Sequence, residues 1–88
     1  MTWNYRIIRD IVTFGDKKYP RYSVHEVFYN NDGSIMTCTQ DPEELCWTDD
    51  TDMEALKNLK ECIKTIARDI EKYPVLDITN IPGCEGEE

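Results

Sequence analysis

Apolar and polar side chains alternate through the first 40 residues, and a period of two is the pattern of β-strands. Turn-forming residues interrupt this alternation at 15–18 and at 31–33, where Asp32-Gly33 is a common hairpin signal. Pro20 should precede the second strand, because proline cannot donate to a strand ladder. Short connections favour antiparallel neighbours. The pattern therefore predicts a three-stranded antiparallel meander over residues 3–14, 21–30 and 34–40.

A helical period replaces the alternation after a polar connection over residues 41–51. Thr51 and Glu54 have the spacing of a capping box, which predicts where the helix begins. Pro74 predicts where it ends. Within residues 52–72, apolar side chains recur three or four positions apart and form a single stripe. The members of this stripe are Leu56, Leu59, Ile63, Ile66 and Ile70.

These elements define an α+β fold, in which a three-stranded antiparallel β-meander packs against one C-terminal amphipathic helix in the order βββα. Val75, Leu76 and Ile78 can add a short final strand or a strap. We expect residues 1–79 to form a single α+β domain, because a chain of 88 residues supports one core. We expect residues 80–88 to form a flexible acidic tail.

The chain shows no membrane or export signal. Its longest apolar runs are two or three residues, whereas a membrane-spanning helix needs about 20. We therefore expect a cytoplasmic protein that does not contact a membrane. The four cysteines are widely spaced and include no C-x-x-C pair, so free thiols are expected in that compartment. Cys62 falls within the helix and should be a small buried hydrophobic residue.

The formal net charge of −8 is concentrated in the middle of the chain, where residues 31–55 contain eight acids and no base. Direct nucleic-acid binding is disfavoured, because phosphate contacts need a basic surface. We expect instead a basic protein partner, such as a complex that itself binds nucleic acid, whose phosphate sites carboxylates can occupy. The acids expected to make this contact are Glu43, Glu44, Asp49 and Asp50.

One helix can cover only one face of a sheet, so the sequence also predicts an exposed aromatic face on the other side. Such a surface usually marks an interaction site. Tyr5 and Tyr29 are the sheet residues expected to contact a protein partner or a second copy of the chain. Trp47, in the polar connection, is expected to tuck against the sheet or the helix.

Little in the sequence suggests catalysis. His25 and Glu26 are neighbours in a strand, so their side chains point to opposite faces and cannot act as an acid–base pair. His25 and the cysteines lack the closely spaced pairs that anchor zinc sites, and residues 49–52 lack the spacing of a calcium loop. We therefore expect no cofactor, no metal and no catalytic residue. A small metal protein or enzyme built on His25 and the cysteines is a third hypothesis.

The opening W-N-Y-R-I-I at residues 3–8 and the segment Y-S-V-H-E-V-F-Y at 22–29, followed by Asp32-Gly33, resemble motifs in small uncharacterised bacterial and prophage proteins. The resemblance extends to an acidic linker, one helix and a closing Pro74-Val75-Leu76. It implies a fold and no activity.

The preferred hypothesis is a non-enzymatic acidic protein-binding module. Its small size and acidity match the format of phage-encoded inhibitors of host defence complexes, including anti-CRISPR proteins. The alternative is a homodimeric bacterial scaffold, in which two sheets pack face to face or edge to edge.

Overall fold

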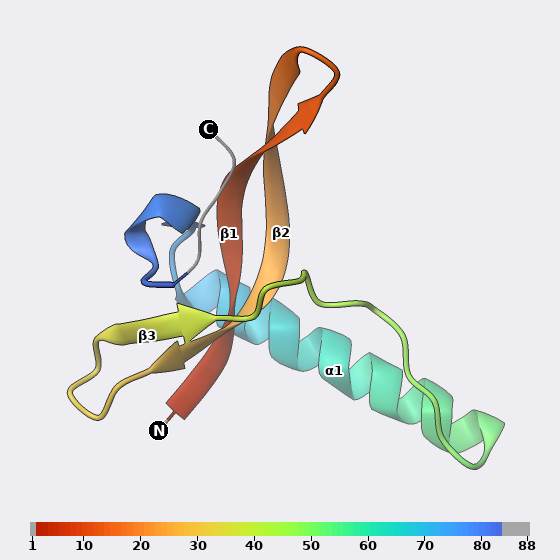
Figure 1. Ribbon diagram of the computed structural model, residues 1–88. Helices are drawn as coiled ribbons and strands as arrows, with labels where there is room; N and C mark the ends of the chain where they lie inside the picture. The colour runs from red at the N-terminus through yellow and green to blue at the C-terminus, as the bar shows by residue number, and fades with distance from the viewer. Residues whose placement is uncertain (1, 84–88) are drawn as a thin grey trace.

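The computed structural model describes residues 2–83. They form one four-stranded sheet in the order β3-β2-β1-β4, together with one long helix (Figure 1). The predicted antiparallel meander of three strands is confirmed. The short fourth strand, however, runs parallel to β1, so the sheet is mixed. The elements are β1 (Thr2–Phe14), β2 (Lys17–Tyr29), β3 (Ile35–Cys38), α1 (Asp52–Lys72), β4 (Leu76–Asp77) and the 3₁₀ turn η1 (Ile78–Asn80).

The β1–β2 hairpin is longer than predicted, and its far end stands beyond the rest of the sheet (Figure 1). Gly15 takes a positive φ of 65° in the two-residue turn, which suits a residue without a Cβ. The prediction that Pro20 precedes the strand is wrong, because Pro20 pairs with Ile11 inside β2. The Ile11–Pro20 pair is the third pair beyond the Phe14–Lys17 pair that closes the turn, and it occupies a non-hydrogen-bonded position of the ladder. The proline nitrogen therefore faces the open edge of β2, and no hydrogen bond between β1 and β2 is lost.

The helix begins and ends where the sequence predicts. The Thr51 side chain accepts a hydrogen bond from the Glu54 backbone N–H at 3.2 Å. Only the second half of α1 lies over the sheet, and Ile66 is its one fully buried side chain. The first half projects past the sheet (Figure 1), so Met53 and Leu56 are 84% and 54% exposed. The apolar stripe therefore packs along part of its length only.

The face of the sheet opposite α1 is covered by the end of the chain. Ile8, Val27 and Cys38 point to this face, and Ile81 packs on them to form the main core cluster. The predicted exposed aromatic face is absent from the middle of the sheet, because the segment after β4 lies over the surface that the helix leaves open. At the far end of the β1–β2 hairpin, Phe14 and Tyr19 are exposed, at 68% and 44%. Ile81 is only 3% exposed, so the packed chain extends two residues past the predicted boundary at 79. Residues 84–88 of the predicted tail lie outside the described residues.

A buried arginine ties this second face to the end of the helix. Arg6 is 7% exposed, and its Nε and Nη2 donate to the Pro74 carbonyl at 3.2 and 2.8 Å. Its Nη1 donates to the Tyr29 hydroxyl at 3.3 Å, and its guanidinium lies 5.7 Å from the Tyr73 ring centroid. These contacts fix how the chain leaves α1 and enters β4.

Candidate protein-binding groove

An open hollow of about 420 Å³ lies between α1, the middle of β2 and the chain that follows β3. We call it the apolar groove. The stripe of α1 forms one wall, and Tyr22, Val24 and Leu45 form much of the other. The lining residues are Tyr22, Ser23, Val24, Pro42, Glu43, Leu45, Ile63, Ile66, Ala67 and Ile70.

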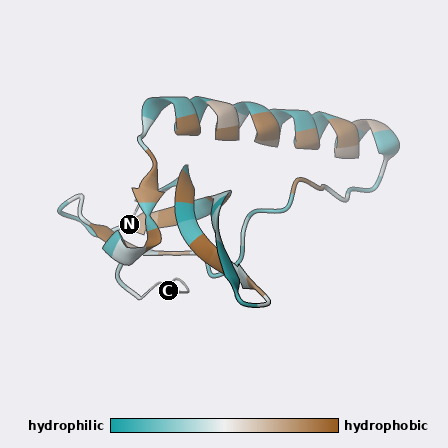
Figure 2. Cartoon of the chain, turned by 90° about the horizontal axis from the view of Figure 1, so that it is seen from above, coloured by the Kyte–Doolittle hydropathy of each residue, from teal (hydrophilic) through white to brown (hydrophobic). Residues whose placement is uncertain are grey.

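Backbone hydrogen bonds place the chain after β3 beside β2. The Thr39 N–H donates to the Glu26 carbonyl at 2.9 Å, and the Glu43 N–H donates to the Val24 carbonyl at 2.7 Å. The chain therefore follows β2 beyond the end of β3 before it turns away towards the start of α1. We call residues 41–51 the acidic loop; Figure 2 shows it on the side of α1 that carries the apolar stripe.

The apolar side chains of the groove are largely open to solvent. Tyr22 is 61% exposed, Leu45 63% and Ile63 44%. The exposed apolar surface continues along α1 to Leu56. Trp47, predicted to tuck against the sheet or the helix, is 47% exposed, so about half of its side chain lies in solvent. Large adjoining apolar side chains left in water are typical of a surface that docks another molecule.

The four predicted contact acids lie along the acidic loop. Glu43 lines the groove, and Glu44 is exposed next to it. Asp49 and Asp50 lie at the other end, where Asp49 accepts hydrogen bonds from the Asn58 side-chain amide at 2.7 Å and from the Asp50 N–H at 2.8 Å. The structure therefore places the acids in two pairs along one loop rather than in one cluster.

The two predicted contact tyrosines lie on opposite faces of the sheet. Tyr5 is 7% exposed beneath α1, and its hydroxyl lies 4.0 Å from the Cys62 sulfur. Tyr29 is half-buried on the other face and donates from its hydroxyl to Asn4 at 2.8 Å. Neither tyrosine lines the groove. Tyr22, which lines the groove, is 61% exposed, and the other exposed aromatic side chains among residues 2–83 are Trp3, Phe14, Tyr19 and Trp47.

Two carboxylates, Glu26 of β2 and Glu43 of the acidic loop, lie close enough for their charges to interact. Burial first, and the negative charge of Glu43 second, raise the pKa of Glu26 above its usual range. Burial also raises the pKa of the Tyr5 hydroxyl well above its ordinary value, with smaller contributions from Cys62, Glu43 and Glu26. Of these carboxylates, Glu43 is the one that lines the groove.

The residues considered for metal or acid–base chemistry have structural partners. His25 is 1% exposed; its Nε2 lies 2.9 Å from the Ser23 hydroxyl, and its Nδ1 lies 3.0 Å from the Thr39 carbonyl. Among residues 2–83, no three His, Cys, Asp or Glu side chains come together as metal ligands. Cys62 is half-buried rather than fully buried, and the part of the chain described contains no helix with the length and hydropathy of a membrane span.

Comparison with known proteins returns no matching family model, no matching curated protein and no matching solved structure. The functional assignment therefore depends on the geometry and charge of this chain.

Proposed function

We propose that this chain is a non-enzymatic protein-binding module, whose apolar groove docks a basic, amphipathic segment of a partner protein. The observation that carries the proposal is an open apolar groove flanked by an acidic loop. Leu45 and Ile63 offer apolar contacts that supply affinity when water is excluded. Glu43 and Glu44 offer negative charge that selects and orients a basic segment.

The partner class that we infer is a protein that itself binds nucleic acid. Such proteins expose lysine and arginine side chains to phosphates, and carboxylates on the acidic loop would compete for the same side chains. The module would then act as an inhibitor by excluding nucleic acid. We extend the proposal to phage-encoded inhibitors of host defence complexes, which share this small acidic format.

The test is affinity capture of a purified basic partner by charge-altered variants. Glu43→Lys with Glu44→Lys reverses the charge at the groove. Glu61→Lys with Glu71→Lys makes the same change in net charge on exposed positions of α1 that do not line the groove. We expect the groove variant to lose capture at physiological salt and the matched variant to retain it, because location rather than net charge supports binding.

The partner for this test is first captured from a host-cell lysate treated with nuclease. The captured partner is then purified and mixed with the purified variants. Loss of capture in both variants would show that the interaction depends on net charge and not on the groove, and would contradict the proposal. Retention in both would show that the acidic loop does not take part.

A second candidate, self-association, is favoured by the overhanging half of α1. Met53, Leu56 and Ile63 leave an apolar strip in solvent, and two such strips can pack as antiparallel helices. Sedimentation would then show a concentration-dependent dimer that Leu56→Glu disrupts. Val75→Glu is the matched control, because Val75 is 50% exposed and lies after the helix. A monomer at all concentrations would exclude this candidate.

A further inference from the structure

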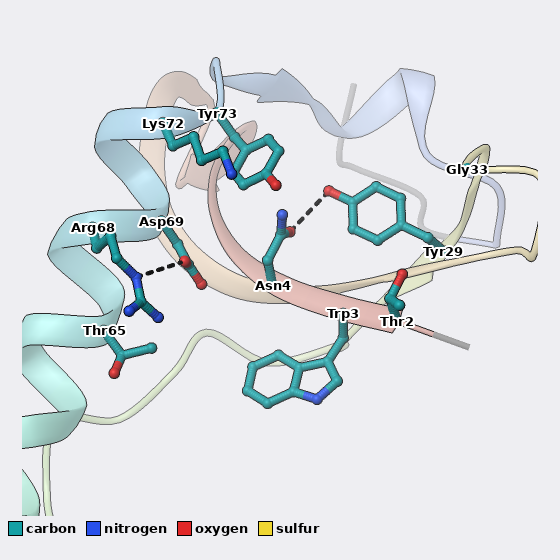
Figure 3. Close-up of a pocket in the computed structure, with 10 residues that line it drawn as sticks. All are labelled: Thr2, Trp3, Asn4, Tyr29, Gly33, Thr65, Arg68, Asp69, Lys72 and Tyr73. Carbon is teal, nitrogen blue, oxygen red and sulfur yellow. Dashed lines mark hydrogen bonds and ion pairs between the residues drawn. The ribbon is translucent and has the colours of Figure 1, made fainter.

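A second hollow, of about 720 Å³, lies at the C-terminal end of α1, away from the apolar groove. The start of β1, the end of β2 and the turn before β3 form its strand side, and the last turns of α1 form its helix side (Figure 3). We call it the basic pocket. Its lining residues are Thr2, Trp3, Asn4, Tyr29, Gly33, Thr65, Arg68, Asp69, Lys72 and Tyr73.

Two cations on successive turns of the helix give this pocket its charge. Arg68 and Lys72 are four residues apart, so they lie on the same side of α1 (Figure 3). The Arg68 side chain is 75% exposed, and its Nε lies 3.8 Å from the Asp69 carboxylate. Asp69 is only 15% exposed, and its other oxygen accepts a hydrogen bond from the Tyr5 N–H at 3.1 Å. The groups presented to solvent are therefore mainly positive, on a chain whose net charge is −8.

A hydrogen-bond chain orients a donor towards the pocket. Buried Arg6 donates to the Tyr29 hydroxyl at 3.3 Å, so that hydroxyl uses its own proton to donate to Asn4 Oδ1 at 2.8 Å. The amide nitrogen of Asn4 then points the other way, towards the Tyr73 side of the pocket (Figure 3). It has no hydrogen-bond partner among residues 2–83. A fixed donor in a pocket that two cations also line is suited to an anionic oxygen.

Trp3 supplies an aromatic surface to the same pocket from the other face of β1, because it is the strand neighbour of Asn4 (Figure 3). Its ring contacts Tyr5 edge to face, with centroids 5.2 Å apart and an interplanar angle of 86°. This contact holds the indole in place, while 49% of Trp3 stays exposed. A held but half-exposed indole can stack on a planar ring.

We propose that the basic pocket binds a small aromatic phosphate of the nucleoside monophosphate type. The ring of the ligand stacks on Trp3, and its phosphate pairs with Arg68 and Lys72 while it accepts a hydrogen bond from Asn4. Phosphate matches two cations and one donor because it offers up to two negative charges and several acceptor oxygens. This site is separate from the apolar groove and does not depend on the proposed protein partner.

The test is a fluorescence titration with AMP in the Trp47→Phe variant, where Trp3 is the only tryptophan. We expect saturable quenching with a dissociation constant below about 1 mM. Phenyl phosphate should also bind, whereas adenosine and inorganic phosphate alone should each bind at least about tenfold more weakly, since each lacks one recognised group.

Arg68→Gln and Lys72→Gln should each weaken AMP binding about tenfold, because each removes one charge-assisted contact. Lys57→Gln and Lys60→Gln remove the same charge elsewhere on α1 and should leave the affinity unchanged. Absence of saturable quenching with AMP and phenyl phosphate would overturn the proposal. Equal weakening by all four variants would overturn it too, because the effect would then be one of net charge.

Discussion

At the scale of single residues, the polar groups that this chain buries are all paired. In the described chain, no buried side-chain nitrogen or oxygen lacks a hydrogen-bond partner. Asp10, 7% exposed, receives two hydrogen bonds from Arg21 across the β1–β2 ladder, at 3.0 and 2.7 Å. His25 and Arg6 are satisfied in the same way. Because a buried unpaired group is costly, each of these residues should be sensitive to substitution.

Arg6 offers the clearest test of this sensitivity. Arg6→Met keeps much of the side-chain volume but removes the hydrogen bonds to the Pro74 carbonyl and the Tyr29 hydroxyl. We expect the free energy of unfolding to fall by about 2–4 kcal/mol, since the Pro74 carbonyl and the half-buried Tyr29 hydroxyl each lose a charged hydrogen-bond donor. Arg68→Met, at an exposed position, should change it by less than about 0.5 kcal/mol. Urea denaturation measures both, and equal effects would contradict the role of Arg6.

Glu26 predicts a pH dependence of stability. Its pKa is raised in the folded protein, chiefly by burial and then by Glu43, so the folded state holds the proton to a higher pH than the unfolded chain does. Protonated Glu26 therefore stabilises the folded protein fully at pH values below the pKa of Glu26 in the unfolded chain. This stabilisation is lost as the pH rises through the pKa of Glu26 in the folded protein. Glu26→Gln should therefore raise the urea midpoint near neutral pH and have little effect at low pH.

The matched control for this pH prediction is Glu71→Gln, because Glu71 is exposed on α1. It should leave the midpoint unchanged at both pH values. A Glu26→Gln variant that is less stable than the parent near neutral pH would contradict the assignment.

At the scale of elements, α1 has two halves with different energetic roles. The second half packs on the sheet through Ile66, whereas Leu56 in the first half is mostly in solvent. Ile66→Ala should reduce the free energy of unfolding by about 2–4 kcal/mol, because it leaves a cavity. Leu56→Ala should lower the free energy of unfolding by less than about 1 kcal/mol, since about half of the Leu56 side chain is already exposed to water in the folded protein. Chemical denaturation measures both; similar losses would show that the whole stripe is packed.

The sequence predicts an element well when the residues that determine it lie close together along the chain. The bounds of α1 follow from the Thr51 cap and Pro74, and the meander follows from alternation and short turns. Leu76 pairs with Ile8 in parallel, although β2, β3 and α1 separate these two residues in the sequence. No local pattern in the sequence indicates such a distant pairing. The covering of the second face depends on Ile81, which stands within an apparently polar end of the chain.

The sequence indicates only part of the proposed groove, for the same reason. The acids of the loop could be named because charge is read directly from sequence. The sequence alone groups Tyr5 and Tyr29 as sheet aromatics, although the register places Tyr5 opposite Glu26 and Tyr29 opposite Thr2, on different faces. The sequence does not indicate that Leu45 and Ile63 line one groove. They come together only because the acidic loop runs beside β2 in the folded chain.

At the scale of the whole molecule, the chain is more extended than its length requires. Its radius of gyration is 14.9 Å, whereas a closely packed domain of this length has about 12 Å. The projecting half of α1 and the far end of the β1–β2 hairpin account for the difference (Figure 1). The buried apolar side chains among residues 2–83 are few: Tyr5, Ile8, Val27, Cys38, Ile66 and Ile81.

A small core beside exposed apolar surface predicts that partner binding stabilises the fold. A ligand that binds only the folded state raises stability by about 2.7 kcal/mol at a hundredfold excess over its dissociation constant. Thermal unfolding of the purified complex should therefore occur at a higher temperature than unfolding of the protein alone. The Glu43→Lys, Glu44→Lys variant should show no such increase, and an equal increase in that variant would contradict binding at the groove.

The most direct test of the central claim is a methyl NMR titration with a synthetic amphipathic peptide of leucine and lysine at helical spacing. We expect the methyl signals of Leu45, Ile63 and Ile70 to shift with added peptide, while those of Ile8 and Ile81 do not. The same peptide with glutamate in place of lysine should produce no shift. Shifts confined to the core methyls, or equal shifts with both peptides, would contradict docking of a basic segment in the apolar groove.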